Sequence, residues 1–253
     1  MKLFGGGTFL DSDVEDWCFE TWRWLMANLG GIDRLRSTPL VLPTREFFPP
    51  TDEEGEARAV YIFGIVKELM GLSNWPCVLE FHDRPSQRQR VGLVSAVNVG
   101  SSANGTFRVN DGQAIVSCAR DLIAEPRNLI ATMAHELAHY RLATVEDPQP
   151  GGADLHELAT DLAVAYCGFG VFAANHAFSF QQHQDTFSQG WSSSRSGYLS
   201  ERTWAFAIAL FVALKGVALP LEMLKPSVAD LTKAASRYLV KHKELIRPFE
   251  AFA

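Results

Sequence analysis

Two histidines stand four residues apart in the segment His-Glu-Leu-Ala-His, which begins at His135 and ends at His139. On a helix, residues four apart lie one turn above each other, so both imidazoles can reach one ion at roughly 2.0–2.1 Å. Glu136 lies about 100° around the same helix. It can flank a metal without binding it, which is the position of a base that acts on metal-activated water. The segment therefore predicts His135 and His139 as metal ligands and Glu136 as the general base.

The surrounding residues favour a helix at about 126–143, with Pro126 in its first turn. Asn128, Thr132 and His139 fall within about 60° of His135 around this helix. The opposite side is mainly apolar and carries Leu129, Ile130, Met133, Leu137 and Tyr140. We expect the apolar side to pack on the core and the polar side to line a cleft. The alternative is a solvated helix with two exposed histidines.

A catalytic zinc usually takes three protein ligands and leaves one position for water. The metzincin pattern is excluded, because Leu142 and Val145 stand where it requires glycine and histidine. The next candidate is Glu157, 18 residues after His139 (157 − 139), on a helix expected at about 154–168. Asp161 follows one turn later and can accept the outer N–H of a metal-bound histidine.

Two alternatives remain open for this third position. Asp154 and Glu157 also match a helix cap, in which Glu157 serves only to close the first turn. His156 is a rival ligand, which would give an all-histidine site. Its side chain lies about 100° from that of Glu157, so both cannot point squarely at one ion.

His135-Glu136-x-x-His139 followed by Glu157-x-x-x-Asp161 resembles the gluzincin group of zinc peptidases, and most closely its compact members, the minigluzincins. The match covers roughly residues 113–170. The resemblance implies a zincin-like α+β fold with an active-site helix, a second helix bearing the glutamate, and an edge strand just upstream. Substrate would pair with that edge strand through its backbone. By position, residues 113–118 are the candidate for it.

A hydrolase of this type also benefits from a donor that stabilises the developing oxyanion. Tyr198 is the preferred candidate, because it follows a polar stretch and precedes a helix expected at 200–215. The structural alternatives are a tyrosine that takes part in ordinary packing and one that lies on the loop surface. The other possible donors are Tyr140, His176, His183 and Arg195.

The chain-wide pattern predicts an α+β fold, with strands early, helices late and helices packed on one face of a small sheet. We expect a single zincin-like domain over 1–253, with helices and sheet in about 1–125 and a mainly helical metal-site half in about 126–253. Further helices are expected at 14–29, 54–70 and 226–245. Strands are expected at 39–48, 77–81 and 113–118, with one or two hairpin strands inside 83–112. Residues 171–196 read as a polar loop or an ordered insertion.

The composition argues against two classes of binding partner. The 253 residues carry a net charge of −6, and the sequence has no dense Lys/Arg tract, so nucleic acid is not an expected partner. The apolar run from Trp204 to Leu214 is too short to span a bilayer and reads as a buried core helix, so no membrane partner is expected. Four scattered cysteines, most of them expected to be buried, favour a cytoplasmic protein with reduced thiols.

Together these features predict a zinc-dependent hydrolase that cleaves a peptide or protein substrate. Histidine and carboxylate ligands favour Zn²⁺ as the cofactor. Two alternatives are a catalytically silent zincin scaffold that binds or regulates, and a zinc-hydrolase toxin or effector. The sequence leaves the oligomeric state open.

Overall fold

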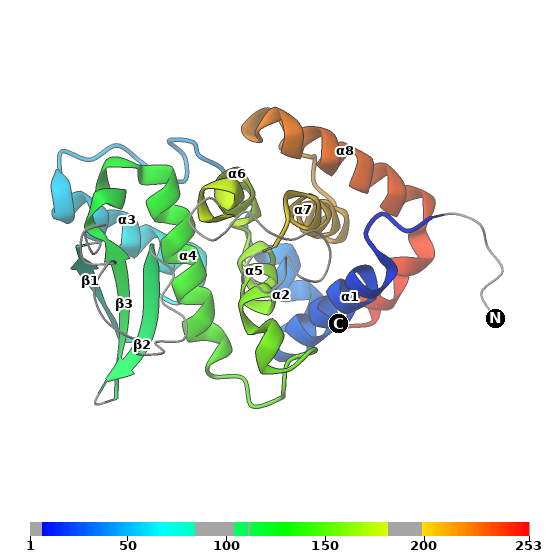
Figure 1. Cartoon of the computed structure of the whole chain (residues 1–253), viewed down its shortest axis with the longest axis horizontal. Coiled ribbons are helices and arrows are strands. Elements are labelled where there is room, and N and C mark those ends of the chain that lie inside the picture. Colours follow the sequence, from blue (N-terminus) through cyan, green and yellow to red (C-terminus); the bar gives the residue numbers. More distant parts are fainter. Residues whose placement is uncertain (1–6, 84–103, 111, 182–198, 253) are drawn as a thin grey trace, which may run out of the picture. The chain divides into compact units, whose positions relative to one another are not determined.

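The computed structural model of the chain contains helices and one small sheet, and it describes residues 7–83, 104–110, 112–181 and 199–252 (Figure 1). The chain divides into two compact units. One unit is Pro43–Thr144, and the other combines Met1–Leu42 with Val145–Ala253. The expected α+β class is confirmed. In the described residues no helix has the length and apolarity that crossing a bilayer requires.

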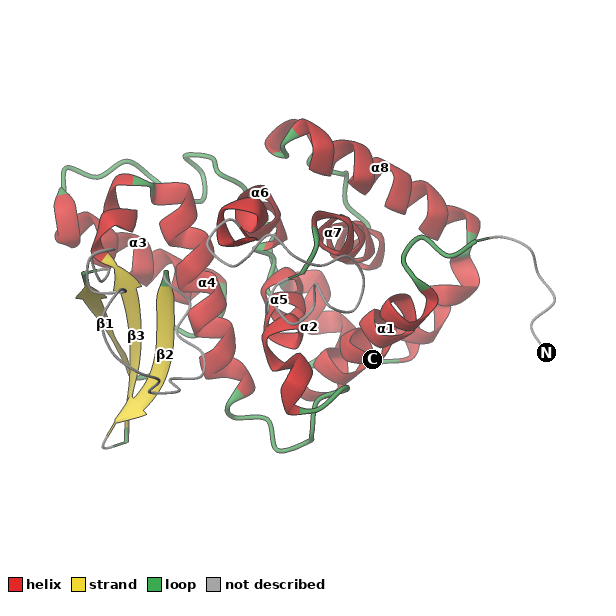
Figure 2. Ribbon diagram, viewed as in Figure 1, coloured by secondary structure: helices red, strands yellow, loops and turns green. Residues whose placement is uncertain are grey.

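The unit Pro43–Thr144 contains the sheet. Its elements are α3 (Gly55–Leu69), β1 (Cys77–His82), β2 (Gly105–Asn110), β3 (Gln113–Ala119), the short 3₁₀ segment η2 (Arg120–Ala124) and α4 (Pro126–Leu142). The strand order is β1-β3-β2, with β1 parallel and β2 antiparallel to β3 (Figure 2). Gly112, just before β3, adopts a φ of 77°, a left-handed conformation that glycine takes without steric cost.

The candidate edge strand at 113–118 is a wrong prediction. These residues form β3, which is paired on both sides and is the central strand. A central strand has its backbone groups engaged with two neighbours and cannot take up a third. The antiparallel strand at the edge is β2, and in the described part of the chain no strand pairs with its other side.

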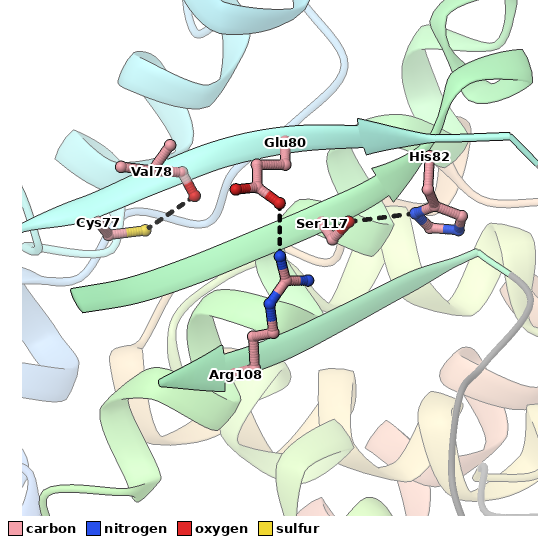
Figure 3. Close-up of polar contacts among 6 residues, drawn as sticks. All are labelled: Cys77, Val78, Glu80, His82, Arg108 and Ser117. Atoms are coloured by element: carbon pink, nitrogen blue, oxygen red, sulfur yellow. Dashed lines mark hydrogen bonds and ion pairs between the residues drawn. The ribbon is translucent and has the colours of Figure 1, made fainter. Parts of the chain in front are cut away.

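On the face of the sheet away from α4, polar side chains connect the strands. Arg108 on β2 reaches across the central strand to Glu80 on β1, with Nη2 and Oε2 2.5 Å apart (Figure 3). His82 Nδ1 lies 3.2 Å from Ser117 Oγ on β3. Both residues of the ion pair are about half exposed, so its contribution to stability is at most about 1 kcal/mol. Its structural effect is to connect two strands that are not neighbours.

The other unit is entirely helical in its described part. Its α-helices are α1 (Ser12–Asn28), α2 (Gly31–Ser37), α5 (His156–Tyr166), α6 (Gly170–Gln181), α7 (Glu201–Lys215) and α8 (Pro226–Lys241). Shorter 3₁₀ segments are η3 (Ala153–Leu155), η5 (Leu221–Met223), η6 (Lys243–Leu245) and η7 (Arg247–Ala251). The expectation of a buried helix at 204–214 is confirmed, because α7 is buried on nearly every side among α2, α5, α6 and α8. Three of the four cysteines are buried, as expected.

Most predicted helices are confirmed to within a few residues, but two segments differ. Residues 39–48 form turns instead of a strand, because prolines at 39 and 43 remove backbone donors and Val41 bonds instead to Gly168 O. Residues 170–181 form α6 where a polar loop or an ordered insertion was expected. Its buried residues Val171, Phe172 and Ala174 supply an apolar face that the surrounding polar composition obscured. Residues 182–196 of that segment, and residues 84–103 of the expected hairpin segment 83–112, lie outside the described residues.

A buried carboxylate organises the helical unit near its N-terminal end. Glu15 is 4% exposed, and its Oε2 accepts hydrogen bonds from Phe9 N at 2.9 Å and Leu10 N at 3.1 Å. Its Oε1 accepts from the Tyr238 hydroxyl at 2.6 Å. Burial, and then the hydrogen bond to Glu15, raise the pKa of Tyr238 above the ordinary tyrosine value. The contact therefore joins α1, α8 and the segment that precedes α1.

Replacing Tyr238 with phenylalanine should lower the free energy of unfolding by about 1–3 kcal/mol, because it removes a donor from a buried carboxylate. The native state keeps the tyrosine proton above pH 10 while the unfolded chain loses it, so the wild-type stability falls as the pH rises beyond about 10. In Tyr238→Phe this part of the fall in the free energy of unfolding at alkaline pH should be absent. Urea titrations from pH 7 to 11 measure both effects. The exposed Tyr61→Phe is the control, and equal stability of the two variants would contradict the assignment.

Candidate metal centre

The two histidines of α4 turn toward each other. Their Nε2 atoms lie 3.1 Å apart, and their rings meet nearly edge to face with centroids 4.8 Å apart. Two ligand atoms of a tetrahedral zinc ion bound at 2.0–2.1 Å are separated by roughly 3.3–3.4 Å. The observed spacing is close to that value. It is also a hydrogen-bond distance, so a neutral pair can share a proton across the same gap.

The helix that carries the histidines is buried along most of its length. Every residue from Asn128 to Ala138 is buried, including the polar side that we expected to line a cleft. His135 is 7% exposed and Glu136 is 3% exposed, while His139 is half-buried. The alternative of a solvated helix with two exposed histidines is therefore wrong. Such burial is unusual for ionisable side chains unless they are paired or bind metal.

The position of α4 is fixed at its C-terminal end by contacts inside the same unit. The ring of Tyr140 stacks on Phe107 of β2, with centroids 5.3 Å apart, and meets Trp75 edge-on at 5.0 Å. Its hydroxyl donates to Pro76 O at 3.0 Å. Arg141 Nη1 donates to Met70 O at 2.6 Å. These bonds hold the turn that carries His139 against the sheet and the end of α3.

Glu136 lies on the side of α4 that faces the sheet. Burial, and then the nearby Glu136 carboxylate, raise the pKa of the Cys118 thiol on β3 above its ordinary value. The first residue of β2, Gly105, is packed so closely on Glu136 and Thr132 that it has no room for a side chain. No sequence pattern indicated Gly105, which precedes Glu136 by 31 residues (136 − 105), whereas helical spacing already placed Thr132 near His135.

Glu157 lies in the first turn of α5 and is half-buried. Among the described residues, one group of three side chains could hold a metal ion, namely His135, His139 and Glu157. His135 and His139 belong to the unit Pro43–Thr144, and Glu157 belongs to the other unit. Two imidazoles and one carboxylate are a donor set that zinc accepts in catalytic sites. The chemistry of the side chains therefore fits a zinc ion.

The alternatives at the third position are less well supported. The capping alternative required Asp154 as the cap of α5, but the cap residue is Leu155, whose side chain makes no cap hydrogen bond. Asp154 instead lies within η3. His156 Nδ1 lies 2.9 Å from Gln149 Oε1, and this residue is not part of the metal-binding group.

Asp161 is 3% exposed on α5. Its Oδ2 accepts a hydrogen bond from Leu199 N at 3.0 Å, so this carboxylate anchors the residue from which the chain enters α7. That structural role was not foreseen from the sequence. The expected bond from a metal-bound histidine stays a prediction.

Of the candidate oxyanion donors, Tyr198, His183 and Arg195 lie outside the described residues. The Tyr140 hydroxyl is engaged with Pro76 O, as described above, and His176 Nδ1 lies 2.8 Å from Phe172 O within α6. These two contacts give Tyr140 and His176 structural roles.

Comparison with known proteins adds no relative. No protein-family model, curated protein or solved structure matches the chain.

Metal analysis of variants tests the third ligand. We expect the wild-type protein to bind one zinc ion per chain, and Glu157→Ala to weaken zinc binding by more than about 100-fold, because losing an outer partner of a ligand already weakens binding by about 10–100-fold. His156→Ala is the matched neighbouring control and should retain zinc. Competition with a chromophoric chelator gives the affinities. Stoichiometric, tight zinc in Glu157→Ala with loss in His156→Ala would reverse the assignment.

Proposed function

We propose that this protein is a zinc-dependent hydrolase that cleaves peptide bonds. The observation that carries the proposal is the convergence of the His135 and His139 Nε2 atoms at 3.1 Å on a buried helix that also bears Glu136. Glu157 supplies the third ligand in this proposal. The resemblance to gluzincins supports the same assignment through His135-Glu136-x-x-His139 and Glu157-x-x-x-Asp161.

The proposed chemistry is the addition of water across a peptide bond. When bound, zinc lowers the pKa of a water molecule toward neutrality and polarises the substrate carbonyl. Glu136 takes a proton from the attacking water as the new C–O bond forms. Glu136 then delivers that proton to the leaving nitrogen as the C–N bond breaks, so the carboxylate is regenerated. In the same proposal Asp161 orients a histidine ligand and Tyr198 stabilises the oxyanion.

Strand β2 is the proposed place for an extended substrate. Ala119 N donates to Asn104 O at 2.8 Å, and this bond fixes which residues of the antiparallel ladder form hydrogen-bonded pairs. Because such pairs alternate along a strand, the backbone groups of Phe107 and Val109 point away from β3. A peptide can pair with this side of β2 and thereby lie along the helix that carries Glu136, since α4 packs against β2.

Two substitutions separate metal binding from turnover. Glu136→Gln should retain zinc and lose about 10²–10⁴-fold in kcat, the usual contribution of a general base. His139→Ala should lose zinc. Zinc at a thousandfold excess over its Kd should stabilise the wild type and Glu136→Gln by about 4 kcal/mol, and should leave His139→Ala unchanged.

Peptide-library cleavage, elemental analysis and thermal unfolding measure these quantities. Equal turnover by Glu136→Gln and wild type would refute the mechanism. Zinc binding without cleavage of any peptide would instead favour a silent scaffold that binds or regulates.

Backbone-methylated substrates test the role of β2. Methylating one substrate amide that donates to β2 should raise KM by about tenfold, because one neutral hydrogen bond contributes about 1–1.5 kcal/mol. Methylating the alternate amides, which face away from the strand, should have little effect. A scan that shows no alternation with position would argue against strand pairing.

A further inference from the structure

Gly105 begins β2 at a point where the sheet approaches α4 closely. Its backbone is not in the left-handed region, so an alanine would meet no intrinsic strain there. A Cβ at this position would nevertheless lie 2.6 Å from Thr132 Cγ2 and 2.8 Å from Glu136 Oε1. Both distances are shorter than ordinary van der Waals contact. Close packing, and not backbone conformation, is therefore what requires glycine here.

The two atoms next to Gly105 differ in how far they can move. Thr132 is 1% exposed and β-branched, and its side chain is held in few rotamers on a helix. Its Oγ1 has no hydrogen-bond partner in the described structure, so Thr132 acts on its neighbours through its shape. The Glu136 carboxylate stands at the end of a longer side chain. An added methyl group at position 105 would displace this carboxylate before it displaced Thr132.

We propose that Gly105 and Thr132 are positioning residues that fix the carboxylate of Glu136. The bare Cα of Gly105 bounds the carboxylate from β2, and the Thr132 methyl group, one helical turn before Glu136, holds the adjacent space. The kinetic consequence rests on the proposed function, because it requires Glu136 to be the base. A displacement of about 1 Å in a reacting group can reduce a rate by about 100-fold.

Gly105→Ala is the direct test. We expect full zinc content, a KM within about twofold of the wild type, and a kcat lower by about 10–100-fold. If Gly105 served only folding, the substitution would not lower kcat while leaving KM nearly unchanged. Gly64→Ala is the matched control in α3 of the same unit, because a Cβ at Gly64 meets no atom within 4 Å. It should retain both zinc and kcat.

The double variant Gly105→Ala/Thr132→Ser supplies a rescue. Serine lacks the Cγ2 atom that an alanine at 105 would strike, so the new methyl group can shift toward position 132 and release the carboxylate. We expect the double variant to recover at least about tenfold of the lost kcat, measured against Thr132→Ser alone. Should Gly105→Ala fail to fold, Thr132→Ala replaces it, since that change adds no atom and removes the methyl group beside Glu136. Thr132→Ala should then lower kcat severalfold at full zinc content.

Crystal structures of the zinc-loaded variants give a readout that does not depend on turnover. The Glu136 carboxylate should be displaced in Gly105→Ala and return in the double variant. An undisplaced carboxylate together with a wild-type kcat would overturn the proposal, as would an unchanged kcat and carboxylate in Thr132→Ala. If the wild type cleaves no peptide, the proposed function fails, and the crystal structures alone still decide whether Gly105 positions Glu136.

Discussion

The burial of α4 against the sheet is the constraint on which the candidate site depends. A helix bearing two histidines and a glutamate would ordinarily turn them toward water, yet His135 and Glu136 are almost fully covered. The same helix buries Thr132 Oγ1 and Asn128 Oδ1 without hydrogen-bond partners in the described structure. Each such group costs about 1–3 kcal/mol. A helix selected only for stability would carry apolar residues at these positions, and this supports the proposal that the polar side of α4 serves a bound metal ion.

Apolar packing on the other sides of α4 offsets the cost of these buried polar groups. Leu129, Met133 and Leu137 are at most 1% exposed. At the C-terminal end of α4, Tyr140 lies between Trp75 and Phe107. Arg141 donates a hydrogen bond to the carbonyl oxygen of Met70, at the C-terminal end of α3. On the opposite face of the sheet, Arg108 connects β2 to β1 through Glu80 (Figure 3). Strand β2 is thus held from both faces, and its first residue can serve as a fixed wall beside Glu136. Sites on rigid elements hold their groups more accurately than sites on loops.

How well a feature could be predicted from the sequence depends on how far apart in the chain the residues that determine it lie. The helix at 126–142 and its paired histidines are encoded in a continuous stretch, through Pro126, the apolar period and the four-residue spacing. Strand order is not encoded locally, so β3 was taken for an edge strand although β1 and β2 enclose it. The contact between Gly105 and Glu136 joins residues far apart in the chain, and no pattern in either segment indicates it. Glu157 could be selected by residue type and helical spacing, but the rival ligand His156 and the capping alternative with Asp154 could be weighed only once their contacts were known.

Two buried glutamates in this chain show how surroundings, and not residue type or burial, separate a structural carboxylate from a candidate base. Glu15 and Glu136 are 4% and 3% exposed, so solvent access does not distinguish them. Glu15 receives two backbone N–H groups on one oxygen and a phenolic hydroxyl on the other, and all three donors belong to the fold itself. Moving its carboxylate would break contacts that join α1, α8 and the N-terminal segment. Glu136 lies beside the Cα of Gly105 and the methyl group of Thr132, and its helix also carries the two histidines. In the proposed reaction the shape of this enclosure matters as much as the charge of the carboxylate, because a methyl group added at position 105 would displace it.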